Sequence, residues 1–281
     1  MGAIAQWWGN RTTLQRFLVL FVFLLLIISI IFVLTRGPGP QAGIYVVPVS
    51  GGDPTFVTGG SEPAWSPDGD TFLLTSPDEQ GVPGIYTIDA GGGDVTFVTN
   101  GAEPAWSPDG ASIAFTGEDA EGNLSIYTIE VGGGEAVFLT DGEAPAWSPD
   151  GSTLALTGSG EGGNPGVYLF DLEASQVTFL TDGADPSWHP DGSSIAFVGE
   201  NAEGGSDVYT IDLAGSEVTF ITGGDDPAWS PDGSTIALTG QADIGSAVYT
   251  IQPGAEVVFV TNGEAPAWSP DGSEIAHVRT Q

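Results

Sequence analysis

The chain has 281 residues, no cysteine, no lysine and a formal net charge of −33. All 37 acidic residues follow position 52, where Arg279 is the only base, so residues 43–281 carry −36 and the first 42 residues carry +3. Without cysteine the protein can form no disulfide and no cysteine-based metal site. The strongly negative charge of residues 43–281 repels nucleic acid. We therefore exclude nucleic acid as a partner.

The N-terminal part contains a long hydrophobic segment. Residues 17–34 form 18 consecutive positions in which Ser29 is the only polar residue. A helix of this length spans about 27 Å, close to the hydrocarbon thickness of a bilayer. A cleaved signal peptide is the alternative, but the segment is longer than a usual signal-peptide core and no A-x-A site follows it before the repeats start. We predict a transmembrane helix over residues 17–35.

The residues on either side of this segment predict its orientation. Arg11 and Arg16 precede it, and Arg36 alone follows it. The positive-inside rule then places a short tail, residues 1–16, in the cytoplasm. A Gly/Pro linker over residues 36–42 would join the helix to a periplasmic or extracellular domain. We expect a single-pass membrane protein.

A tryptophan-centred phrase, PAWSPDG or a near copy, recurs six times in the rest of the chain. Successive tryptophans are 41 residues apart, and the last interval is 39. A period in this range, filled with short strands, is typical of a β-propeller with one blade per repeat. The repeated tryptophans are Trp65, Trp106, Trp147, Trp188, Trp229 and Trp268.

Each repeat is predicted to contain four strands, here called A, B, C and D. In the repeat over residues 104–140 they are 104–106, 113–115, 126–129 and 136–140, which are rich in β-branched and aromatic residues. Strand A is followed by a Ser-Pro-Asp-Gly turn, in which proline presets φ and aspartate bonds nearby backbone amides. We predict as turn residues Asp68, Asp109, Asp150, Asp191, Asp232 and Asp271.

The two ends of the repeat region complete the ring. Residues 44–49 and 55–58 read as strands C and D alone, whereas residues 266–278 read as strands A and B alone. Together they predict a sixth blade, which would close the ring and leave no open edge between its ends. The predicted fold class is all-β, a six-bladed propeller of four-stranded blades preceded by one transmembrane helix.

Aromatic residues repeat at the same spacing. Their periodicity predicts that they belong to the core. Strand C contributes Tyr45, Tyr86, Tyr127, Tyr168, Tyr209 and Tyr249, and strand D contributes Phe56, Phe97, Phe138, Phe179, Phe220 and Phe259.

The WSPDG turn after a short strand resembles the WD40-like repeat of the TolB (PD40) type. The resemblance covers residues 43–281, and one copy departs from it, with His189 in the serine position. It implies a six-bladed propeller. TolB is a soluble periplasmic protein with an extra domain ahead of its propeller, and it docks on an envelope lipoprotein. Related propellers serve as gating domains of prolyl-oligopeptidase-like enzymes.

A carboxylate stands three or four residues before each repeated tryptophan. If strand A is innermost, these D-to-A loops surround one mouth of the central channel. The arrangement predicts a docking site for a cationic group, namely a divalent metal, an amine or a basic segment of a partner. The alternative is that the repeats simply duplicate one solvated loop residue. The candidate residues are Glu62, Glu103, Glu143, Asp185, Asp225, Asp226 and Glu264.

Signals for catalysis are few. Neither of the two histidines has a persuasive partner for catalysis. His189 replaces a turn serine, and His277 occupies a strand B site that holds leucine or phenylalanine elsewhere. We interpret His277 as a packed edge residue. No nucleophile elbow, P-loop or zinc-protease motif occurs. We expect no enzyme activity and no cofactor, with structural calcium as the alternative that carboxylates without histidine favour.

These observations predict a membrane-anchored extracytoplasmic propeller that acts as a protein-binding or scaffold subunit of an envelope or membrane assembly. Because D-to-A and B-to-C loops share a face, the stem should join the face of the acidic mouth, which favours a neighbouring membrane protein with a basic surface as partner. The alternatives are a sensor for a cation or small cationic ligand, and a propeller enzyme acting on an envelope or extracellular polymer. The acidity alone also fits simple solubility or a salty habitat.

Overall fold

The computed structural model describes residues 41–160, 163–243 and 245–280. The chain divides into two compact units, Met1–Gln41 and Ala42–Gln281, and nearly all described residues belong to the second. The predicted cytoplasmic tail, the transmembrane helix and most of the linker therefore lie outside the described residues. Within the described ranges, no helix has the length and apolar character needed to cross a membrane.

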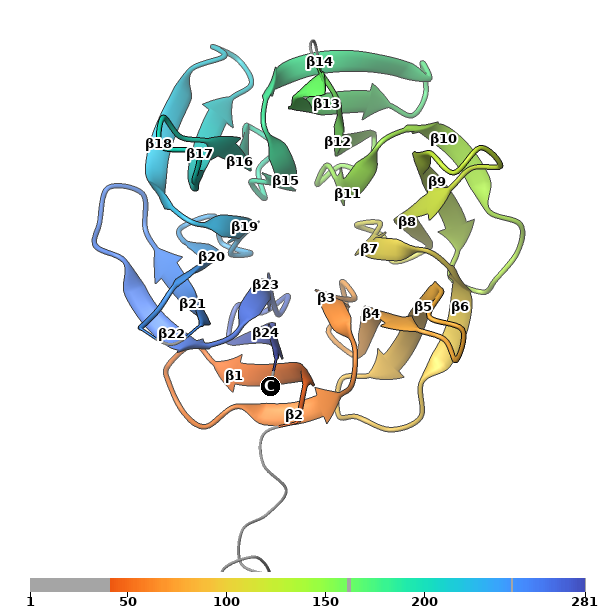
Figure 1. Ribbon diagram of the computed structural model, residues 1–281, viewed down its shortest axis with the longest axis horizontal. Coiled ribbons are helices and arrows are strands. Elements are labelled where there is room, and N and C mark those ends of the chain that lie inside the picture. Colours follow the sequence, from red (N-terminus) through yellow and green to blue (C-terminus); the bar gives the residue numbers. More distant parts are fainter. Residues whose placement is uncertain (1–40, 161–162, 244, 281) are drawn as a thin grey trace, which may run out of the picture. The chain divides into compact units, whose positions relative to one another are not determined.

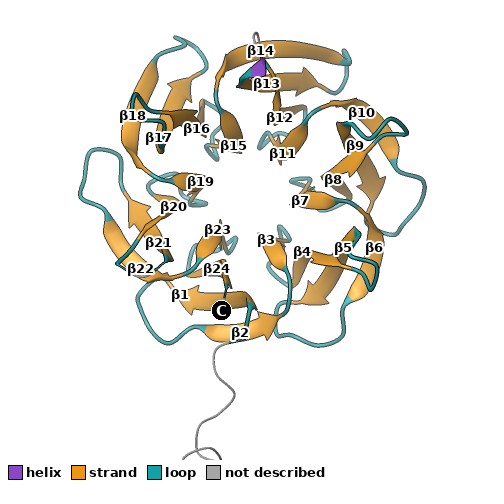
Figure 2. Ribbon diagram, viewed as in Figure 1, coloured by secondary structure: helices purple, strands orange, loops and turns teal. Residues whose placement is uncertain are grey.

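Twenty-four strands in the described part of the chain form six antiparallel four-stranded sheets around a central channel (Figure 1). Strands and short loops make up nearly all of this unit (Figure 2). The prediction of an all-β, six-bladed propeller is confirmed for this unit. Each blade runs from strand A at the channel to strand D at the outside.

The strands of the first three blades have the following bounds. Blade 1 contains β3 (Ser61–Trp65), β4 (Thr71–Pro77), β5 (Pro83–Asp89) and β6 (Thr96–Asn100). Blade 2 contains β7 (Ala102–Trp106), β8 (Ser112–Glu118), β9 (Leu124–Glu130) and β10 (Val137–Asp141). Blade 3 contains β11 (Glu143–Trp147), β12 (Thr153–Ser159), β13 (Pro165–Asp171) and β14 (Gln176–Asp182).

The remaining blades repeat the pattern, and the last one combines both ends of the unit. Blade 4 contains β15 (Ala184–Trp188), β16 (Ser194–Glu200), β17 (Ser206–Asp212) and β18 (Val218–Gly223). Blade 5 contains β19 (Asp225–Trp229), β20 (Ile236–Gln241), β21 (Ser246–Ile251) and β22 (Val258–Asn262). Blade 6 contains β23 (Glu264–Trp268), β24 (Glu274–Arg279), β1 (Gly43–Pro48) and β2 (Thr55–Thr58).

Blade 6 closes the ring as the sequence predicts, with the strand order β2-β1-β24-β23. Strands β1 and β24 pair over six residues, from Gly43 opposite Arg279 to Pro48 opposite Glu274. Arg279 also ties β24 to blade 5, because its Nε donates to the Asn262 carbonyl at 3.2 Å. Its guanidinium lies 4.9 Å from the centre of the Tyr45 ring.

The hydrophobic core lies between neighbouring blades and is built from strands B and C. At one such interface Phe72 and Leu74 of blade 1 pack against Ile44 and Val46 of blade 6. Equivalent clusters recur around the ring, each joining one blade to the next. Blade-to-blade packing therefore stabilises the ring by burying apolar surface.

The expectation that the strand D phenylalanines belong to the core is wrong. Their side chains are between 39% and 57% exposed. Strand D is the outermost strand of each blade and has a neighbour on one side only, so a phenylalanine there covers the blade rim. Each ring packs edge-on against a strand C tyrosine, as in Tyr86 and Phe97, whose ring centres are 5.4 Å apart.

The repeated tryptophans join strand A of one blade to strand A of the preceding one. The Nε1 of Trp106 donates to the Ala64 carbonyl at 3.2 Å, and the Nε1 of Trp188 donates to the Ala146 carbonyl at 3.1 Å. Trp147 and Trp268 make the same bond. Among the described residues, the indole nitrogens of Trp65 and Trp229 are buried and have no partner.

The repeated aspartates lie in the turns between strands A and B. Asp109, for example, accepts a hydrogen bond from Ser107 Oγ at 2.6 Å and one from the Ala111 amide at 3.0 Å. These bonds lower the pKa of the Asp109 carboxyl. His189 replaces the serine of its turn and takes over its role, because its Nδ1 lies 2.6 Å from Asp191 Oδ1. His189 therefore has a carboxylate partner within its own turn.

His277 does not lie at an edge, contrary to the expectation. Strand β24 is flanked by β1 and β23, so the His277 side chain is fully buried. Neither ring nitrogen has a hydrogen-bond partner among the described residues. Burial, together with the nearby charge of Arg279, lowers the pKa of His277 to about 4, so the ring is neutral at pH 7.

Candidate functional site: the acidic channel mouth

A bulge in strand A positions the side chains at one mouth of the channel. In blade 1 the pairing of β3 with β4 shifts register between Ser61 and Ala64, and the other blades repeat this shift. The residue three before the tryptophan takes a left-handed conformation, with φ between 49° and 52°. The six residues in this conformation are Glu62, Glu103, Ala144, Asp185, Asp226 and Ala265.

These six residues, each followed by proline, line a single opening with a cavity volume of about 220 Å³. Four of them are acidic. Of the seven carboxylates predicted for the mouth, the structure brings together there Glu62, Glu103, Asp185 and Asp226.

The other three predicted residues lie one position earlier in strand A and do not line the opening. Each of them stands opposite a residue of strand B, as Glu143 stands opposite Thr157. The other two are Asp225 and Glu264. Glu143 faces a groove on the side of blade 3, and burial with the charge of Glu103 raises its pKa. The sequence contained the distinguishing signal, because the mouth residues stand three and not four positions before the tryptophan.

Two of the mouth carboxylates also connect neighbouring blades. Glu62 Oε2 accepts a bond of 2.6 Å from the Thr75 hydroxyl and one of 2.7 Å from the amide of Glu103 in the next blade. Glu103 Oε2 likewise accepts bonds from the Thr116 hydroxyl at 2.7 Å and from the Ala144 amide at 2.8 Å. Sequence reasoning missed these strand B threonines.

Asp226 occupies the corresponding position in blade 5. Burial raises the pKa of its carboxyl, while hydrogen bonds from the Thr239 hydroxyl and the Ala265 amide oppose the shift. The Thr239 hydroxyl also accepts a bond of 3.0 Å from that amide.

Asp185 differs from the other three carboxylates. Val198 occupies the strand B position that holds Thr75, Thr116 and Thr239 elsewhere, so no hydroxyl is present to bond Asp185. Its carboxylate reaches the water of the mouth and has no hydrogen-bond partner among the described residues. The channel walls remove part of its hydration and Asp226 repels its charge, so its pKa rises to about 6.

The mouth can therefore attract and orient a cation. The only base of the propeller, Arg279, bonds to Asn262 and to the Thr261 hydroxyl and does not line the opening. The described residues contain no group of three or more histidine, aspartate or glutamate side chains that could hold a metal ion. Carboxylates accept hydrogen bonds, so the mouth suits an ammonium or guanidinium group chemically.

Comparison with known proteins supports the fold. A putative TolB from Agrobacterium tumefaciens is 25% identical, with a TM-score of 0.72 over 85% of this chain and 98% of that chain. TolB from Acinetobacter baumannii is 23% identical, with a TM-score of 0.71 over 86% of this chain and 70% of that chain. An oligogalacturonate lyase from Vibrio parahaemolyticus, 12% identical, has a TM-score of 0.54 over 87% of this chain and 99% of that chain.

The last comparison shows that the propeller fold also occurs in an enzyme, so the fold alone does not decide catalysis. No curated protein matches the sequence. The family described as "PD40: TolB beta propeller domain" matches residues 139–281, half of the chain. The chain therefore belongs to the TolB beta-propeller family.

Proposed function

We propose that this protein is a membrane-anchored, extracytoplasmic propeller that binds a basic partner protein at its acidic channel mouth. It acts as a docking or scaffold subunit of an envelope or membrane assembly. The observation that carries this proposal is the convergence of Glu62, Glu103, Asp185 and Asp226 on one opening. Membership of the TolB family is compatible with a protein-binding role.

The route of the chain favours a partner in the same membrane. Gly43, the first residue of β1, stands opposite Arg279 of β24, and Glu264 stands opposite the neighbouring Val278. The chain therefore joins the propeller on the face of the mouth. If residues 17–35 form the predicted anchor, a neighbouring membrane protein with a basic outer surface is the partner we expect.

Asp185 is the best residue for testing this proposal. Glu62 and Glu103 bond the next blade, so changing them alters the fold as well as the charge. Asp185 has no such bond, and Asp185→Asn removes a mouth charge with the smallest effect on the blades. Glu173→Gln, in the exposed loop after β13, is the matched control on the opposite face.

The experiment is a pull-down of the full-length chain from its native membrane in mild detergent. We expect one stoichiometric partner with the wild type and with Glu173→Gln, and its loss with Asp185→Asn, because the acidic mouth loses one of the charges that attract a basic surface. A partner retained by Asp185→Asn would place the interface elsewhere on the propeller. No partner with any of the three proteins would contradict the scaffold role.

A further inference from the structure

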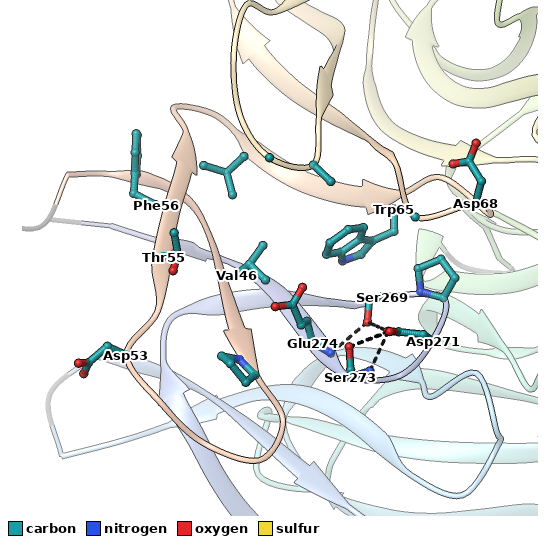
Figure 3. Close-up of a pocket in the computed structure, with 16 residues that line it drawn as sticks. Val46, Asp53, Thr55, Phe56, Trp65, Asp68, Ser269, Asp271, Ser273 and Glu274 are labelled. Carbon is teal, nitrogen blue, oxygen red and sulfur yellow. Dashed lines mark hydrogen bonds between the residues drawn. The ribbon is translucent and has the colours of Figure 1, made fainter.

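The groove between blades 6 and 1 departs from the repeat pattern. It has a cavity volume of about 540 Å³ and is lined by β1, β2, β3 and the turns that precede β4 and β24 (Figure 3). These A-to-B turns lie on the face opposite the channel mouth. Because repeats duplicate structure automatically, the residues that differ here are those that need a separate explanation.

Two residues distinguish this groove from the equivalent groove between blades 2 and 3, which has a similar volume of about 560 Å³ and is lined by Leu172 and Ser112. Ala90 follows β5 at the position that holds Val131, Leu172 and Leu213 in the next three blades. The amides of all four residues donate to the equivalent carbonyl of the A-to-B turn. Glu274 begins strand B at a position that holds only serine or threonine in the other blades, namely Thr71, Ser112, Thr153, Ser194 and Thr235. The smaller Ala90 does not enlarge the groove, so the feature that sets this groove apart is the charge of Glu274.

The wall of the groove contains an indole with an unused donor. Trp65 does not bond the preceding blade as Trp106 does, and its buried Nε1 has no partner among the described residues. Phe72 replaces the isoleucine or leucine of the other blades, and its ring centre lies 4.0 Å from that of Trp65. The indole packs on Phe72 and borders the groove together with Val46 and Val57.

The charge of the groove is entirely negative. Glu274 points into it between Val46 and Trp65 (Figure 3). Asp271 lies at the rim, where hydrogen bonds from Ser273 and Ser269 lower its pKa to about 2 and keep it ionised. Asp53 and Asp68 also line the groove, and no basic residue does.

We propose that this groove is a second ligand site, for a small organic cation that carries an ammonium group on an apolar body. The ammonium group pairs with the Glu274 carboxylate, and the apolar body packs on Val46 and the indole of Trp65. An aromatic face beside a carboxylate attracts such ions through charge and the ring quadrupole. The volume is in the range of small-molecule pockets.

Calorimetric titration of the full-length chain with 2-phenylethylammonium chloride tests this site, and the neutral 2-phenylethanol serves as the matched probe. We expect saturable binding of the ammonium and about tenfold weaker binding of the alcohol, because a charged hydrogen bond is lost. Glu274→Ser restores a residue that other blades use, so the variant should fold, and it should weaken ammonium binding by about tenfold or more.

Glu135→Ser, in an exposed loop outside the groove, removes the same charge and should bind as the wild type does. Equal affinity of wild type and Glu274→Ser would overturn the proposal, and so would the absence of saturable binding to the wild type. An equal loss in Glu135→Ser would attribute binding to net charge alone. Tighter binding of the peptide acetyl-Gly-Lys-Gly-amide would assign the groove to a protein side chain instead.

Discussion

Asp185 illustrates how one residue can break a repeated pattern. The other acidic mouth residues have a strand B threonine beside them, and Asp185 has Val198. A carboxyl with a folded-state pKa of about 6 and an ordinary value of 3.8 binds its proton more tightly in the folded protein. Its contribution to the free energy of unfolding therefore grows as pH falls through this interval and is lost as pH rises above about 6.

The change Val198→Thr should supply the missing hydroxyl and lower the pKa of Asp185. Because the hydroxyl favours the ionised form, we expect the variant to be more stable than the wild type by about 1 kcal/mol at pH 7.5. The difference should shrink toward pH 4, where Asp185 is protonated. Thermal unfolding of both proteins from pH 4 to pH 8 measures this, and a pH-independent difference would contradict it.

His277 titrates in the opposite sense. Its pKa is about 4 in the folded protein and 6.5 ordinarily, so the unfolded chain binds a proton first as pH falls. The change His277→Leu introduces the residue found in blades 1, 3 and 5. It removes the loss of stability that protonation of this histidine in the unfolded chain causes at low pH. At pH 4 we expect it to stabilise the protein by roughly 3 kcal/mol. Little difference is expected above pH 7. Denaturant titrations of the two proteins at several pH values measure this, and an equal pH dependence of the free energy of unfolding would contradict the prediction.

At the scale of strands, the sequence predicts the number and sequence of strands in each blade better than it predicts which side chains are exposed. The period and the composition predict four strands per repeat correctly, because alternating turn and β-branched segments are local signals. The burial of Phe97 and its equivalents was predicted wrongly, since periodicity reports that a position repeats and not which side of the blade it faces. The bulge of strand A was also missed, although it separates Glu62 from residues such as Glu143.

Strand β24 is the element whose loss should matter most, since it joins the two ends of the unit. Arg279 holds it to blade 5 through Asn262 and Thr261. The change Arg279→Ala should lower the free energy of unfolding by about 1–3 kcal/mol, because a charged donor with two acceptors is lost. Guanidinium titration measures this. Arg279→Lys, which keeps the charge without the planar fork, should restore only part of the loss.

A stability of Arg279→Ala equal to that of the wild type would show that backbone pairing of β1 with β24 alone closes the ring. Removal of residues 270–281 is the stronger change. It deletes β24 and leaves β1 without its partner, so we expect loss of cooperative unfolding rather than a smaller ring.

At the scale of the whole molecule, the repeats explain the ring and the departures from them suggest function. Six copies of one turn are enough to predict a propeller closed by both ends of the unit. The acidic residues that converge share one spacing, three positions before the tryptophan, but only the left-handed conformation at that position, which Ala144 and Ala265 also adopt, shows why this spacing matters. Nor do the repeats explain the charge of the groove near Trp65, where Glu274 replaces the serine or threonine of the other blades.

The most direct test of the central claim is site-specific photo-crosslinking in the native membrane. A photoreactive amino acid replaces Ala144, which lines the channel mouth, or Ala111, which lies exposed on the opposite face. Docking at the acidic mouth predicts one discrete crosslinked partner from position 144 and none from position 111. A partner crosslinked from position 111 alone would contradict docking at the mouth.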